Sequence, residues 1–357
     1  MRPRRFFLKA NLPSQLGPRD FLNVLFYVLL GGALSSCYVT TQAWTQAKLL
    51  NRRQPISEVL TDPAVDEAVK KKLKFTKAIL AYAEAQGLQI DDSYTKFVAL
   101  DGPAVSYLVQ AAKPDEFKLK TWWFPVVGTV PYLGFFEVAD RNAYAAALEG
   151  EGYEVSRPSA AAFSSLGWFS DPIYSSMLLE TDTDLAQLYF HELTHKTAWV
   201  AGGVEFNENL AEFIGEEMTE RFFKDEGRLD ELEVWSKTRR DRERFKTWLK
   251  ELKSALERYY AEASRESSQI FVRDKKRIIA EHVARKPAFE ASNLVGVKEW
   301  NTPRILGASL YSPDTGLFKK AYKCSGAISF GDFARKVKTR LAKADRAGEG
   351  LKDFCPD

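Results

Sequence analysis

The residues best suited to chemistry are two histidines and a glutamate near the middle of the chain. Residues 191–195 read His-Glu-Leu-Thr-His, an instance of H-E-x-x-H. On a helix, residues four apart share a face, so His191 and His195 can direct two imidazoles at one point. Zinc takes imidazole nitrogens at about 2.0–2.1 Å, and a catalytic zinc site combines three protein ligands with one water. The carboxylate of Glu192 can reach that water and act as a general base.

A third ligand must come from elsewhere in the chain, and we predict Glu208. Gly202 and Gly203 lie between the motif and Glu208, where they can end the first helix and turn the chain back. Asn207 is predicted to cap a second helix that begins at Glu208. Glu212 then lies one turn further along the same face, where it can accept a hydrogen bond from a ligand imidazole.

Two alternatives to this ligand set remain open. His282 is the third and last histidine of the chain and a competing ligand, but its basic neighbours Lys275, Lys276, Arg277 and Arg285 are typical of an exposed helix. An ordinary helix with two histidines also matches H-E-x-x-H, which is a short motif. The apolar residues before the motif and the carboxylate-bearing segment after it favour the metal site.

H-E-x-x-H followed by N-E-x-x-A resembles the gluzincin branch of zinc metallopeptidases, whose third ligand is the Glu of the second motif. The chain is also similar to a bacterial family of predicted membrane-anchored zinc aminopeptidases, in its Cys37 region, residues 120–128, residues 166–172 and the zinc motifs. The resemblance runs from about Leu34 to Phe213 and is weaker in the C-terminal third. It implies one zinc ion per chain, a zincin-like fold and aminopeptidase activity on a peptide or protein substrate.

The predicted elements indicate an α+β fold, with a mixed or antiparallel sheet packed on the active-site helix and a long helical C-terminal region. Strands are expected in residues 93–100, 104–111, 122–127, 130–136 and 153–156. Helices are expected in residues 63–86, 139–148, 228–288 as a hairpin, 303–311 and 330–344, with Asp182 or Thr183 capping the zinc helix. The predicted parts are a signal peptide (1–36), a helical segment (37–90), a catalytic core (91–225) and a helical C-terminal region (226–357).

The N-terminus has the pattern of a secretion signal. Basic residues precede an apolar run from Phe21 to Ala33, and the L-S-S-C at residues 34–37 resembles a bacterial lipobox, in which Cys37 is lipidated. The run is shorter than the roughly 20 apolar residues of a membrane span, and an uncleaved signal anchor is the alternative. Either case implies a protein tethered to the membrane of the bacterial cell envelope and facing the periplasm or exterior. Cys324 and Cys355 would then be left to form a disulfide or remain as two thiols.

Several residues are candidates for contacts with the substrate. Phe124 and Tyr132 lie in a proline-containing segment typical of an edge strand, which could line the cleft or pack an ordinary sheet face. Trp168 belongs to a Gly-Asp-Pro loop before the zinc helix, and it could wall the pocket or anchor the core. Glu205 could bind the amine of a substrate.

An oxyanion that forms during hydrolysis needs a hydrogen-bond donor, which can contribute about 3 kcal/mol. Because two of the three histidines are already assigned to the metal, we expect a tyrosine, with Tyr311 preferred over Tyr132 and Tyr174.

The composition is that of a globular protein, with 45% hydrophobic and 28% charged residues. The net charge of +3 is too small to indicate nucleic acid as a partner. A protein partner cannot be named from the residues. The alternative to an enzyme is a non-catalytic envelope lipoprotein that acts as a scaffold. In that case the charged helical hairpin could bind a protein partner.

Overall fold

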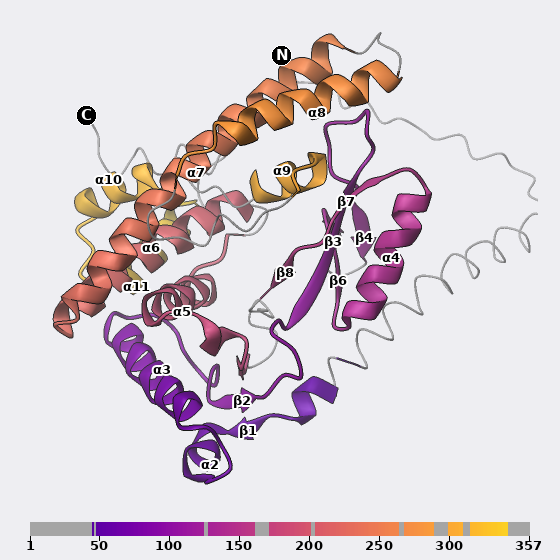
Figure 1. The fold of residues 1–357 in the computed structure, drawn as a ribbon. Coiled ribbons are helices and arrows are strands. Elements are labelled where there is room, and N and C mark those ends of the chain that lie inside the picture. The colour runs from indigo at the N-terminus through magenta and orange to yellow at the C-terminus, as the bar shows by residue number, and fades with distance from the viewer. Residues whose placement is uncertain are drawn as a thin grey trace, which may run out of the picture. The chain divides into compact units, whose positions relative to one another are not determined.

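The computed structural model describes residues 45, 48–124, 128–160, 171–200, 204–263, 268–288, 299–309 and 315–341. The contacts divide the chain into two compact units, Met1–Asn51 and Arg52–Asp357. The second unit carries the labelled helices and strands from β1 onward (Figure 1). It has the predicted α+β class, with small sheets and a long helical C-terminal region. Within the described ranges, no helix combines the length and apolar character needed to cross a membrane.

The largest sheet is built around strand β3 (Ser106–Ala112), which pairs antiparallel with every neighbour. Its partners are β6 (Leu133–Phe135), β7 (Glu154–Ser156) and β8 (Ser159–Ala160). Val109, Ala111 and Ala112 on β3 are fully buried. Helices α4 (Val138–Gly150) and α9 (Thr302–Ser309) both contact β3, which accounts for this burial.

A second sheet leads the chain into the predicted metal helix. It has the order β1 (Gln54–Pro55), β2 (Lys96–Val98) and β9 (Ile173–Tyr174), with β2 and β9 parallel. After β9 the chain passes through the short 3-10 helix η1 (Met177–Leu179) and enters α5 (Asp182–Thr197). Strands β4 (Trp122–Phe124) and β5 (Gly128–Val130) form a separate antiparallel hairpin.

Helix α5 lies between α3 (Glu67–Ala85) and α6 (Val204–Asp225), and α2 (Ile56–Thr61) precedes α3. Tyr189, Phe190 and Leu193 of α5 are fully buried. The approach of α5 and α6 depends on Gly215, because a Cβ added there would lie 3.2 Å from the carbonyl oxygen of Gln187 and 3.5 Å from the Cβ of His191.

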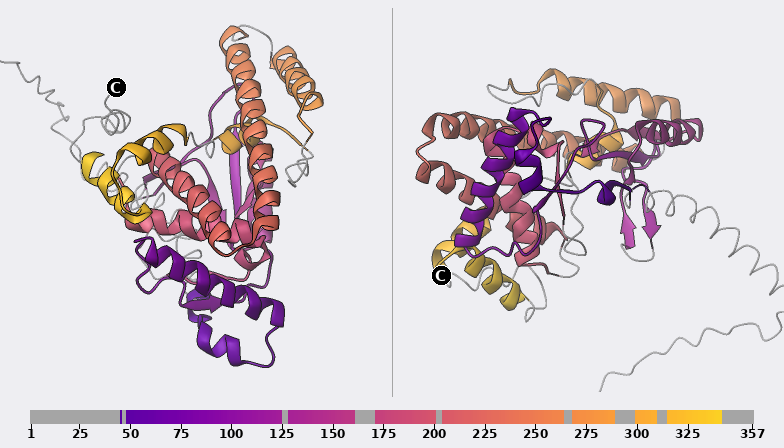
Figure 2. Two further views of the ribbon diagram at one scale, coloured as in Figure 1. Left: turned by 90° about the vertical axis from the view of Figure 1, so that its left-hand side faces the viewer. Right: turned by 90° about the horizontal axis from the view of Figure 1, so that it is seen from below.

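The predicted charged hairpin is confirmed. Helix α7 (Leu229–Glu262) and helix α8 (Ser268–Ala284) contact one another and lie side by side in Figures 1 and 2. Their core contains Trp248, Leu252 and Leu256, together with Ile305 of α9. The fully buried Lys275 of α8 donates to the Glu154 carboxylate (2.7 Å) and the Pro114 carbonyl (2.8 Å), which connects the hairpin to the main sheet.

The C-terminal helices are α10 (Gly316–Cys324) and α11 (Phe330–Leu341), and α10 was not predicted. The predicted strand 93–100 is reduced to Lys96–Val98. Tyr94 has φ +60°, a left-handed conformation that cannot continue a strand. The predicted helix at 63–86 begins only at Glu67, where the side chain of Asp66 caps it.

Candidate metal centre

Helix α5 begins one or two residues earlier than predicted. The cap is Thr181, not Asp182 or Thr183: its hydroxyl accepts from the amide of Asp184 (3.1 Å) and donates to the Asp184 carboxylate (2.8 Å). The first bond is an ordinary N-cap, and the second fixes the rotamer of the Thr181 hydroxyl. Asp182 is instead the first helical residue and forms ion pairs with Lys72 and Arg228. The start of the helix that carries the two histidines is therefore fixed by hydrogen bonds and charges.

The structure brings His191, His195 and Glu208 together. The two Nε2 atoms of the histidines lie 3.1 Å apart. Oε2 of Glu208 lies 3.4 Å from Nε2 of His191, and Oε1 lies 3.4 Å from Nε2 of His195. The three residues form the group that could hold a metal ion in the described part of the chain.

These separations fit a tetrahedral zinc ion. Four ligands at about 2.0–2.1 Å in tetrahedral arrangement are about 3.3–3.4 Å from one another, which is close to the 3.1 Å and 3.4 Å found between the donor atoms. Two imidazole nitrogens and one carboxylate match zinc, whereas calcium and magnesium prefer oxygen ligands. The site leaves a fourth position for a water or a substrate oxygen.

Glu212 lies behind His191, as predicted from its position one turn after Glu208. Its Oε2 is 3.7 Å from Nδ1 of His191, the ring nitrogen that does not face Glu208. The side chain is only 20% exposed. Glu212 is thus placed to orient the imidazole of His191 without contacting a metal ion.

The carboxylates and the histidines shift one another's pKa values. Burial lowers the pKa of His191, but Glu208, Glu212 and Glu192 outweigh it and raise that pKa to about 10. Burial and the neighbouring His191 lower the pKa of His195 to about 4. Burial raises the pKa values of Glu208 and Glu212. His191 and His195 more than offset this for Glu208, and His191 with nearby cations does so for Glu212, so both pKa values lie below the usual range. Without a metal, the site therefore carries one proton on His191.

Glu192 is half-buried, and its negative charge acts on two neighbouring side chains. It contributes to the raised pKa of His191 and, after burial, to the raised pKa of Tyr94. Tyr94 is buried, and its ring packs edge-on against Tyr189 at 4.8 Å. Tyr94 is not among the predicted site residues, because the sequence pattern placed it in a strand.

Asn207 does not cap a helix. Helix α6 begins at Val204, and Asn207 lies inside its first turn. Its side-chain oxygen accepts from the amide of Val200 (2.9 Å), and its side-chain nitrogen donates to the carbonyl of Val200 (2.8 Å). Asn207 therefore joins the segment after α5 to the start of α6, immediately before Glu208. Trp199, in the same segment, packs edge-on against His195 at 5.4 Å and was also missed.

The group that could hold a metal does not include His282. His282 lies on α8, where its Nδ1 contacts the carbonyl of Ile278 (2.9 Å). Phe124 ends strand β4, and Tyr132 precedes β6. Tyr174 is buried in β9, and burial with Asp171 raises its pKa to about 12.

Several predictions concern residues outside the described part of the structure. These are Cys37, Trp168, Tyr311, Cys355 and the side chain of Glu205. Cys324 is disulfide-bonded. Its predicted partner Cys355 is among the residues outside the description, so that pairing stays a prediction.

The fold and this group define an α+β protein with a His-His-Glu site able to hold a metal. Residues 37–349 match a family model described as "Putative aminopeptidase". Because the match covers most of the chain, the protein belongs to this family. No curated protein matches the chain, and no solved structure matches it either. Membership of the family supports a peptidase acting on peptide substrates.

Proposed function

We propose that the protein is a zinc-dependent aminopeptidase of gluzincin type, tethered to the membrane of the bacterial cell envelope through Cys37. The observation that carries the proposal is the convergence of His191, His195 and Glu208. Their donor atoms are separated by 3.1–3.4 Å, with Glu192 next to His191 in the sequence. The family supports peptide hydrolysis.

Zinc, when bound, polarises a peptide carbonyl and lowers the pKa of water to about 7. Glu192 takes the proton of the attacking water and passes it to the leaving amine. Glu212 holds the ring of His191 in the orientation that directs Nε2 to the metal position. Tyr311 donates to the carbonyl oxygen as it gains negative charge, in the role of an oxyanion donor.

The substrate is a peptide with a free N-terminus. Glu205 binds its amine, and Phe124, Tyr132 and Trp168 contact its side chains. A lipid on Cys37 holds the enzyme at the membrane, so that it acts on peptides in the periplasm or at the exterior. The disulfide of Cys324 agrees with an oxidising compartment.

Metal analysis and peptide cleavage test this function together. We expect about one zinc per chain, lost in the variants His191→Ala and His195→Ala and retained in the matched control His282→Ala. Glu192→Gln should keep the zinc and lose cleavage by about 10²–10⁴-fold, the usual contribution of a general base. Cleavage that persists in Glu192→Gln would exclude Glu192 as the base.

Peptides with free and blocked N-termini separate the two kinds of peptidase. An aminopeptidase cleaves the free peptide and leaves its acetylated counterpart intact. Equal cleavage of both would identify an endopeptidase. Bound zinc with no cleavage of any peptide would favour the non-catalytic scaffold.

A further inference from the structure

The segment that contains α10 and α11 is strongly basic. Residues 315–341 include seven Lys and Arg residues and a single acidic residue, Asp332. The whole chain has a net charge of only +3, so the rest of it is net negative. A basic surface on an otherwise acidic chain indicates an anionic partner, because opposite charges both steer and stabilise association.

The turn between these two helices presents an apolar side chain to solvent. Ile328 is 93% exposed, although Phe318 and Phe330 of the flanking helices are buried. The turn has a defined shape: the amide of Ile328 donates to Asp332 (3.1 Å), and Lys336 donates to the carbonyl of Gly326 (3.0 Å). An exposed apolar side chain within a basic segment suits the headgroup region of a membrane, which attracts cations and takes up apolar groups.

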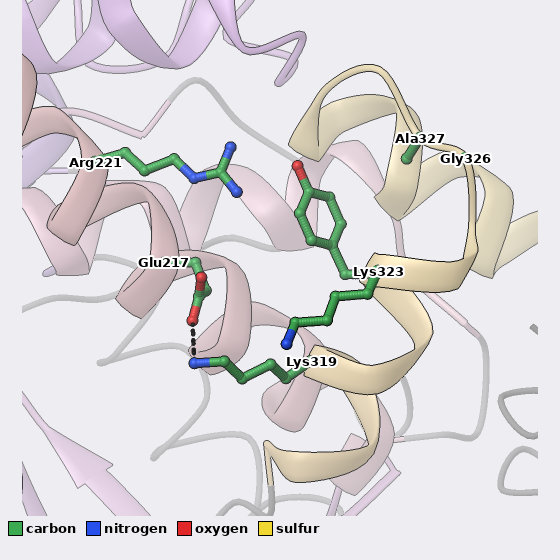
Figure 3. Close-up of a pocket in the computed structure, with 7 residues that line it drawn as sticks. Glu217, Arg221, Lys319, Lys323, Gly326 and Ala327 are labelled. Carbon is green, nitrogen blue, oxygen red and sulfur yellow. Dashed lines mark ion pairs between the residues drawn. The ribbon is translucent and has the colours of Figure 1, made fainter. Parts of the chain in front are cut away.

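A hollow of about 270 Å³ lies beside this turn, between α6 and α10. Figure 3 shows Arg221 reaching into it from α6, while Lys319 and Lys323 reach toward it from α10. Gly326 and Ala327 of the turn complete its lining. The space is large enough for a phosphate group.

The hollow keeps an excess of positive charge. Lys319 is neutralised by Glu217 at 3.1 Å. Arg221 packs over the rings of Phe330 (4.5 Å) and Tyr322 (5.5 Å), which orients its guanidinium. Neither Arg221 nor Lys323 has a carboxylate partner among the ion pairs of the described residues. An oriented guanidinium and a second cation at the edge of a hollow suit a phosphate group.

This surface is distinct from the metal centre. Glu217 lies nine residues after Glu208 on α6, which is two and a half helical turns and about 13 Å along the axis. The two residues therefore lie on opposite faces of α6. A ligand at the hollow can bind without entering the candidate metal site.

We propose that α10, α11 and Arg221 form a docking surface for a bilayer that contains anionic phospholipids. Arg221 and Lys323 bind a lipid phosphate in the hollow, and Ile328 enters the boundary between headgroups and acyl chains. The basic residues of α11 add attraction to the negative membrane surface. This surface orients the protein on the membrane, and it does not depend on the chemistry of the metal site.

Partition of the full chain between water and lipid vesicles tests the proposal. Vesicles of phosphatidylcholine alone are compared with vesicles that also contain phosphatidylglycerol, at lipid concentrations where less than half of the protein is bound. The triple variant Arg221→Gln/Lys319→Gln/Lys323→Gln should bind the anionic vesicles on the order of 100-fold more weakly, since each cation near such a surface contributes about a factor of five. Ile328→Ser should weaken binding about tenfold, because it removes the apolar side chain that enters the bilayer.

The matched control removes three exposed cations elsewhere, in the variant Lys71→Gln/Lys77→Gln/Lys250→Gln. It should bind like the unchanged protein, and the N-terminal segment is common to all variants. Equal weakening in both triple variants would overturn the proposal, because net charge alone would then explain binding. Inorganic phosphate bound in the hollow, with no difference between the two kinds of vesicle, would also overturn it and leave a site for a small anion.

Discussion

Oε2 of Glu212 lies 3.7 Å from Nδ1 of His191, while Nε2 of the same ring faces His195 and Glu208. One imidazole is thus held between a carboxylate and the candidate metal position. A partner behind a ligand histidine fixes the orientation of its ring and increases its basicity.

We expect Glu212→Gln to weaken zinc binding by about 10–100-fold, the usual effect of removing such a partner. The fold should persist, because the amide has the same shape as the carboxylate. Competition with a chromophoric chelator measures the affinity, and the exposed Glu226→Gln serves as the control. Unchanged affinity in Glu212→Gln would show that His191 is oriented by its packing alone.

The proton held by His191 predicts how zinc binding depends on pH. Its pKa is raised to about 10 by three carboxylates, whereas that of His195 is lowered to about 4. Between pH 5 and 9 the metal must displace one proton and not two, so affinity should rise about tenfold per pH unit. Calorimetry in buffers of different ionisation enthalpy counts the protons released, and a count of zero would contradict this charge state.

The raised pKa of His191 also makes the stability of the metal-free protein depend on pH. The pKa of His191 in the folded protein lies above its ordinary value of 6.5. Its contribution to the free energy of unfolding is therefore fully present below pH 6.5 and lost as the pH rises toward 10. The melting temperature of the metal-free protein should fall over that interval, and in His191→Gln this part of the fall should disappear.

Replacement of Gly215 by alanine tests how closely α5 and α6 must approach for the metal site to form. Alanine normally stabilises a helix by up to about 1 kcal/mol relative to glycine. At position 215, however, the new Cβ would meet the carbonyl oxygen of Gln187 at 3.2 Å, and this atom belongs to the backbone of α5. We expect Gly215→Ala to move Glu208 away from the histidines and to lower zinc affinity. Gly150→Ala is the control, since a Cβ there meets no atom within 4 Å. Equal zinc affinity in both variants would show that the helices adjust freely.

The sequence predicted correctly those parts of the site whose geometry follows from the helical repeat alone. Helical spacing of four residues placed His191 beside His195 and Glu208 in line with Glu212, and both relationships are present in the structure. The long hairpin followed from its apolar spacing in the same way. Tyr94 could not be foreseen, because its left-handed backbone is set by tertiary contacts, among them the hydrogen bond from its amide to the carbonyl of Asp171 (2.7 Å). Helix α10 was missed because it has only 9 residues, fewer than the window over which a helical period is recognised.

Asn207 was predicted to cap a helix, but in the structure it holds the segment before α6 in place. Its side chain makes two hydrogen bonds with the backbone of Val200 and is almost fully buried. Replacement by alanine leaves the amide and carbonyl of Val200 without these partners, which costs about 1–3 kcal/mol. Because Glu208 is the next residue, the ligand should also lose its fixed position.

We therefore expect Asn207→Ala to lower both the melting temperature and the zinc affinity. Thermal unfolding with and without zinc measures the two effects, and the stabilisation by zinc should be smaller in the variant, since a ligand stabilises in proportion to the logarithm of its affinity. Asn142→Ala is the matched control, because Asn142 is exposed and its side chain accepts from the adjacent Arg141. A lower melting temperature with unchanged stabilisation by zinc would limit Asn207 to a role in folding.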